Sequence, residues 1–181
     1  SVGLGYTTDT GPRFTLNWQH RQINRRGHRI EAGLETSAIR QGITGKYSVP
    51  LSRPRTDVLD FIGSARREDT DTTKRVMPML RVSRSIQRGK WQKTLYLGFE
   101  REDFELDGGD EGISNLLIPG ASWTWVNANN RLVTRKGSRL RFEVKGSSKS
   151  PVSDTTFVQG HLQAKTIQPM GERGRWVLRA D

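Results

Sequence analysis

The residues that most often carry chemistry are few, and their spacing assembles no catalytic or metal-binding motif. The three histidines, His20, His28 and His161, show no metal-ligand spacing to one another or to carboxylates. The acidic group from Glu102 to Glu111 offers clustered oxygens to a divalent cation, but it lacks the calcium-loop pattern, which favours a solvated loop. No serine lies in a Gly-x-Ser-x-Gly setting. We therefore expect no enzyme activity, no metal site and no cofactor.

Two glycines close to the start of the chain could belong to a phosphate-binding loop. That motif is rejected because no helix is expected after them and its third glycine is absent. The glycines instead alternate with apolar residues in a short expected strand, which they weaken. This strand consists of Val2, Gly3, Leu4, Gly5, Tyr6 and Thr7. On the residues alone it is a flexible strand start.

The stretch from Trp91 to Trp125 gives the clearest element of the chain. Apolar residues occupy every second position from Leu95 to Phe99 and again from Leu117 to Trp125. The acidic segment Glu102 to Gly112 between them contains a glycine turn signal. The pattern predicts a long antiparallel hairpin with arms of nearly ten residues, and tilted strands of about 9–11 residues cross a bilayer. We interpret it as part of a transmembrane β-barrel.

The same alternation recurs along the whole chain and predicts about eleven strands and no convincing helix. The fold class is therefore all-β, an antiparallel up-and-down arrangement in one domain. Phe157 to Thr166 and Trp176 to Ala180 alternate less cleanly, and Pro78 is a residue that a central strand resists. In a barrel, one face of each strand meets lipid. The expected lipid-facing residues are Phe14, Leu16, Trp18, Leu95, Leu97, Phe99, Leu117, Trp123, Leu140, Phe142 and Val144.

Charge is strongly positive, with a net charge of +11. Alternate connections of a meander lie at the same end of the sheet, and the expected connections segregate by sign. The odd ones are acidic and include Asp9, Glu68, Asp69, Asp71, Glu102, Asp103, Glu105, Asp107, Asp110 and Glu111. The even ones are basic and include Arg25, Arg26, Arg53, Arg55, Arg84, Arg88, Lys90, Arg131, Arg135, Lys136 and Arg173. Such segregation favours a barrel with two chemically different ends.

The five tryptophans fall near strand ends or on apolar faces, where an aromatic belt at a membrane interface would place them. In a soluble sandwich they would be ordinary core residues. Basic and aromatic side chains lie on opposite faces of the expected strands, which argues against stacking of nucleic-acid bases.

Several segments resemble, in order and spacing, the barrel domain of the TamA family of outer-membrane assembly proteins, which is related to the BamA insertases. The segments are GLGYTTDTGPRFTLNW, INRRGHRIEAGLETSA, YSVPLSRP, WQKTLYLGFEREDF and LLIPGASW. The resemblance implies a sixteen-stranded barrel preceded by POTRA domains. Residues 1–181 would then be a partial barrel domain that lacks the POTRA domains and the C-terminal strands.

The resemblance also implies a function and a location. The protein would insert or export β-rich outer-membrane proteins of the autotransporter type, in the bacterial outer membrane. The first strand, Val2 to Thr7, would form a weak seam that parts and pairs with a client strand. The implied partners are a TamB-like inner-membrane protein, unfolded outer-membrane clients, and lipid or lipopolysaccharide. The odd, acidic connections would face outward and the even, basic ones the periplasm.

Two other functions fit the same strands. One is a passive porin or autotransporter-like barrel, which would lack the seam. The other is a soluble basic β-sandwich that binds polyanions. If the barrel interpretation is right, the chain cannot close by itself and forms an open sheet, pairs with another copy, or needs further strands.

Overall fold

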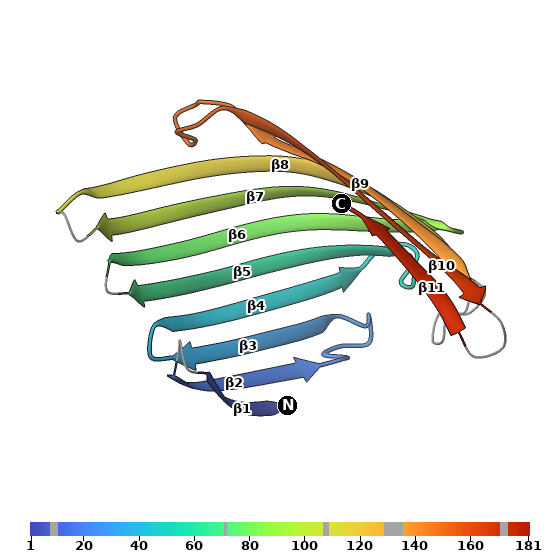
Figure 1. Ribbon diagram of the computed structural model, residues 1–181, viewed down its shortest axis with the longest axis horizontal. Coiled ribbons are helices and arrows are strands. Elements are labelled where there is room, and N and C mark those ends of the chain that lie inside the picture. Colours follow the sequence, from blue (N-terminus) through green and yellow to red (C-terminus); the bar gives the residue numbers. More distant parts are fainter. Residues whose placement is uncertain (8–10, 71, 107–108, 129–135, 171–173) are drawn as a thin grey trace.

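The structure, a computed structural model, describes residues 1–7, 11–70, 72–106, 109–128, 136–170 and 174–181. These residues form eleven strands and no helix, coloured in chain order in Figure 1. The strands are β1 (Val2–Thr7), β2 (Gly11–His20), β3 (Arg29–Ser37), β4 (Arg40–Pro50), β5 (Asp57–Thr70), β6 (Thr73–Arg88), β7 (Trp91–Leu106), β8 (Glu111–Ala128), β9 (Gly137–Ser147), β10 (Phe157–Met170) and β11 (Gly174–Ala180).

All eleven strands belong to one sheet, in which each strand pairs antiparallel with the next one along the chain. This confirms the predicted up-and-down arrangement. No pairing of described residues joins β1 to β11, so the sheet is open, as predicted for a barrel segment that cannot close. Figure 1 shows the β2–β3, β4–β5 and β6–β7 connections on the right, which we call the even end. The β3–β4, β5–β6 and β7–β8 connections lie at the opposite, odd end.

Strand register keeps the apolar positions of neighbouring strands on the same side of the sheet. Residues directly opposite one another in a ladder point to the same face. One continuous row is Trp18, Ala32, Gly45, Gly63, Leu80, Phe99 and Leu117. The next row along is Asn17, Gly33, Thr44, Ser64, Met79, Glu100 and Leu116, and it points the other way. We call these two sides the apolar face and the polar face.

No second layer of described residues covers the apolar face. Ile118 is the one buried hydrophobic side chain among the described residues, whereas Leu80 and Leu162 are 66% and 54% exposed. A water-soluble sandwich buries its apolar faces against each other to offset the entropy lost on folding. The described residues therefore do not form the sandwich that the soluble alternative requires.

The strands are longer than expected, and this corrects the boundaries of the charged connections. β7 has 16 residues and β8 has 18, so most of the segment from Glu102 to Gly112 is strand. Likewise Glu68 and Asp69 belong to β5, and Arg84 and Arg88 belong to β6. Charged residues end the apolar alternation, but the backbone ladder continues past them because their side chains are solvated or paired. Asp9, Asp71, Asp107, Arg131, Arg135 and Arg173 lie outside the described residues.

Pro78 lies inside β6, a central strand. The ladder from β6 to β5 runs through it without interruption, with Ala65 opposite Pro78. The ladder to β7 passes directly from the Val76–Asp103 pair to the Met79–Glu100 pair. Because proline has no N–H to donate, it is accommodated by an interruption on one side of the strand.

Candidate functional site

The free edge of β1 is the candidate site. β1 has six residues and pairs with β2 alone, from Val2 opposite Leu16 to Thr7 opposite Gly11. No described strand covers its other side. Its apolar side chains are strongly exposed, with Leu4 85% and Tyr6 76% exposed. An unpaired edge presents N–H and C=O groups that can pair with another strand.

The two glycines of β1 have different surroundings. Neither has a positive φ, so their backbone conformations are open to any residue. A Cβ built on Gly3 would lie 2.6 Å from the Thr15 Oγ1, and this hydroxyl donates a 3.4 Å hydrogen bond to the Gly3 carbonyl. A Cβ on Gly5 would meet nothing within 4 Å. No steric constraint therefore requires glycine at position 5, and a larger residue would fit there. The glycine only weakens the strand.

The opposite edge of the sheet is β11. Its residues also expose apolar side chains, with Trp176 60% and Leu178 65% exposed. β11 pairs with β10 from Met170 opposite Gly174 to Ala164 opposite Ala180. The two edge strands are the short ones, with 6 and 7 residues, whereas β5 to β8 have 14 to 18.

The eleven side chains expected to meet lipid all lie on the apolar face. Leu4 of β1 lies opposite Phe14 of β2, and Leu80 of β6 lies opposite Phe99 of β7, so these strands share the apolar face. Ala121 of β8 lies opposite both Leu95 of β7 and Val144 of β9, so the apolar face extends to β9. Trp18, Leu97 and Phe142 are 53%, 50% and 44% exposed. The register therefore brings these residues into one surface that has the composition of a lipid-facing surface.

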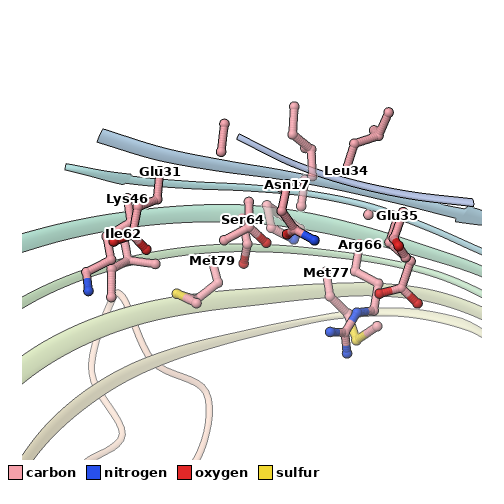
Figure 2. Close-up of a pocket in the computed structure, with 18 of the residues that line it drawn as sticks. Asn17, Glu31, Leu34, Glu35, Lys46, Ile62, Ser64, Arg66, Met77 and Met79 are labelled. Carbon is pink, nitrogen blue, oxygen red and sulfur yellow. The ribbon is translucent and has the colours of Figure 1, made fainter. Parts of the chain in front are cut away.

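The polar face lines an open hollow of about 1330 Å³. Figure 2 shows Asn17, Lys46, Ser64, Arg66 and Met79, which line this hollow from β2, β4, β5 and β6. Its lining combines carboxylates, cations and hydroxyls, so water is the expected filling. Deeper along the same face, the Tyr96 hydroxyl donates a 2.8 Å hydrogen bond to Glu143, and Arg81 lies 5.0 Å from the Tyr96 ring centroid.

The odd end is a network of ion pairs, which corrects the expectation of a purely acidic end. Glu68, with a side chain only 9% exposed, accepts hydrogen bonds from Arg40 at 2.7 Å and Arg75 at 2.6 Å. Arg75 also contacts Glu102 at 3.5 Å. The network therefore ties β4, β5, β6 and β7 together. Opposite charges on adjacent strands produce it, and linear sequence offers no signal for which charges will face one another.

Sequence reasoning also missed a contact between Asp154 and the part of β8 that does not pair with β9, which we call the Asp154 clasp. β9 pairs with β8 only from Gly120 to Ala128, which leaves the odd-end half of β8 without a strand neighbour on that side among the described residues. Asp154 fills part of the gap. Its carboxylate accepts a 2.6 Å hydrogen bond from the Asn115 N–H, and its own N–H donates to the Asn115 carbonyl at 2.9 Å. Asp154 and Asn115 are 39 residues apart, so no local motif marks the contact.

The candidates for metal binding and catalysis remain scattered. No group of three or more histidine, aspartate or glutamate side chains that could hold a metal comes together in the described part of the chain. His28 Nδ1 lies 2.5 Å from the Tyr47 hydroxyl, and the ring of His20 lies beside Trp18. The described residues also contain no helix long and apolar enough to cross a membrane.

Comparison with solved structures supports the fold. No protein-family model matches the chain. Among solved structures, the chain is similar to BamA from Haemophilus ducreyi lacking POTRA domains 1–3, with a TM-score of 0.79 and 14% sequence identity. The alignment covers 98% of this chain and 38% of that one. The chain thus has the fold of an open segment of a BamA-like antiparallel β-barrel.

Proposed function

We propose that this chain is part of an outer-membrane assembly factor, a barrel that helps to insert β-rich proteins into the bacterial outer membrane. The apolar face lies against lipid, and the polar face lines a water-filled interior. The chain acts without catalysis, through backbone pairing at the β1 edge. The observation that carries the proposal is the unpaired β1 edge in a sheet of BamA-like fold.

The proposed mechanism depends on the unpaired backbone groups of β1. Each N–H and C=O on the free side of β1 lacks a partner among the described strands, and such groups are costly in hydrocarbon. A client strand that pairs with β1 satisfies its own groups and those of β1 at the same time. Because β1 is short and contains two glycines, less free energy is needed to bend or part it than a long central strand would require. Strand pairing therefore supplies the binding energy.

The finer proposal is a TamA-type protein. Its barrel has sixteen strands, POTRA domains precede it, and residues 1–181 are a partial barrel domain. The clients are of the autotransporter type, and a TamB-like inner-membrane protein is the partner. The order and spacing of the five quoted segments, from GLGYTTDTGPRFTLNW to LLIPGASW, support this choice.

Site-specific photo-cross-linking tests the proposal. A photoreactive benzoylphenylalanine replaces Leu4 on β1, Leu97 in the middle of the sheet, or Leu178 on β11, in chains reconstituted into phospholipid vesicles. The probe is a urea-unfolded autotransporter β-domain added to the vesicles. We expect adducts at Leu4 and none at Leu97.

Two results would contradict the proposal. Adducts confined to Leu178 would place client pairing on the other edge of the sheet. An absence of adducts at every position, together with fixed ion conductance, would identify the passive barrel instead.

A further inference from the structure

All five tryptophans of the chain lie at the even end of the sheet. Trp18 is close to the end of β2, Trp91 begins β7, and Trp123 and Trp125 are close to the end of β8. Trp176 is close to the start of β11, which is the same end. Trp91 stands directly opposite Trp125, and register places all five on the apolar face. The odd end has no tryptophan among its described residues.

Exposed cations lie at the same end of the sheet as these indoles. Arg25, Arg26, Arg55, Arg88 and Lys90 are all exposed, and none forms an ion pair with a described carboxylate. The carboxylates Asp57 and Asp60 at this end are already engaged, by Arg84 at 2.8 Å and Lys46 at 3.7 Å. The Lys93 ammonium lies over the Trp123 ring, 5.8 Å from its centroid. Several cations at the even end are therefore left for an external partner, whereas at the odd end Arg40 and Arg75 are held by Glu68.

We propose that the even end binds the headgroups of anionic phospholipids. The indoles point to the same side as the leucines that would contact acyl chains, so the partner must present a hydrocarbon body next to its negative charge. A phospholipid has this arrangement, whereas a nucleic acid or an acidic peptide does not. Indole rings prefer the headgroup level of a bilayer, and exposed arginine and lysine attract lipid phosphate.

This inference rests on the proposed membrane location of the apolar face, and it adds a lipid preference and an orientation. The even end sits at the headgroup level of one leaflet, with the indoles at the boundary between headgroups and acyl chains. The described part of the odd end has exposed cations but no indole beside them, so we expect anionic lipid to be enriched around the even end.

Quenching of tryptophan fluorescence by brominated lipids tests the inference, because every indole of the chain reports from this end. The chain is reconstituted into vesicles that contain either brominated phosphatidylglycerol or brominated phosphatidylcholine at equal mole fraction. One basic residue near an anionic surface is worth about a fivefold preference. We expect phosphatidylglycerol to be preferred by at least about fivefold in relative binding constant, with the preference reduced at high salt.

Two triple variants provide the matched comparison, since each lowers the net charge by three. Arg25→Gln, Arg55→Gln and Lys90→Gln remove cations at the even end, and we expect the preference to fall by at least about fivefold. Arg66→Gln, Lys74→Gln and Lys149→Gln remove exposed cations at the odd end, and the preference should persist. Equal quenching by both lipids in the unaltered chain, or an equal loss in both variants, would overturn the inference. Absence of quenching by either lipid would instead refute the membrane location, which separates the two failures.

Discussion

Replacement of Gly5 by valine tests the seam most sharply, because the structure predicts a gain in stability with no packing cost. The ideal Cβ position at Gly5 is free of neighbours within 4 Å, and its φ is not positive. Valine is a strong strand former, whereas glycine loses more backbone freedom on folding. We therefore expect the β1–β2 pairing to gain about 1 kcal/mol, since strand propensities span about that range.

The measurements follow from this magnitude. About 1 kcal/mol corresponds to a roughly fivefold decrease in the population of opened β1. Hydrogen exchange of the β1 amides in vesicles, followed by mass spectrometry, should slow by about fivefold, with exchange in β6 and β7 unchanged. If parting of β1 limits client pairing, the assembly rate of an autotransporter β-domain should fall by a similar factor.

Two further variants serve as controls. Gly160→Val in β10 also meets nothing within 4 Å and lies far along the sheet, so it should leave both rates unchanged. Gly3→Val should stabilise less than Gly5→Val, because its Cβ would contact the Thr15 hydroxyl. Slower exchange in β1 with an unchanged assembly rate would refute the seam mechanism. Unchanged exchange would refute the physical reasoning about Gly5 itself.

Three other substitutions probe the rest of the molecule. Glu68→Gln leaves Arg40 and Arg75 without their shared carboxylate and should lower the free energy of unfolding by about 2 kcal/mol in urea titrations. Asp69→Asn is the control: it removes the exposed ion pair with Arg67 and should lower the free energy of unfolding by about 0.5 kcal/mol or less. If both variants lost the same free energy of unfolding, the Glu68 network would not be a special source of stability. Asp154→Ala removes the acceptor of the Asn115 N–H and should speed exchange of that amide about fivefold, an effect absent from Asp110→Ala. Leu97→Arg on the apolar face should cost about 2–4 kcal/mol near the bilayer centre, whereas Ser64→Arg in the hollow should cost about 0.5 kcal/mol or less.

The strands and their faces could be predicted because both follow from one local property, the period of two. Leu95, Leu97 and Phe99 share a face whatever their neighbours are, since successive side chains of a strand alternate. The same logic placed Leu140, Phe142 and Val144. A shift of one residue in the pairing of two strands would move all apolar side chains of one strand to the polar face. Because this would break up the apolar face, the alternation also predicts which side chains of neighbouring strands share a face.

Strand ends and long-range contacts could not be predicted in this way. Glu102 and Glu68 read as loop residues because they end the apolar alternation, yet the ladders continue through them to Leu106 and Thr70. The pairing of Glu68 with Arg40 and Arg75 depends on register across three strands. The Asp154 clasp depends on the short length of β9, which leaves part of β8 open. Such features arise from tertiary geometry.

Both the proposed function and the lipid preference require the apolar face to contact hydrocarbon, and spin labelling measures this contact. The chain contains no cysteine, so single cysteines introduced from Leu95 to Phe99 and from Leu140 to Val144 carry one label each. In vesicles, we expect high accessibility to dissolved oxygen at Leu95, Leu97, Phe99, Leu140, Phe142 and Val144. We expect access to a water-soluble nickel reagent at Tyr96, Gly98, Arg141 and Glu143. Loss of this two-residue period, or water access on both faces, would contradict the contact with hydrocarbon.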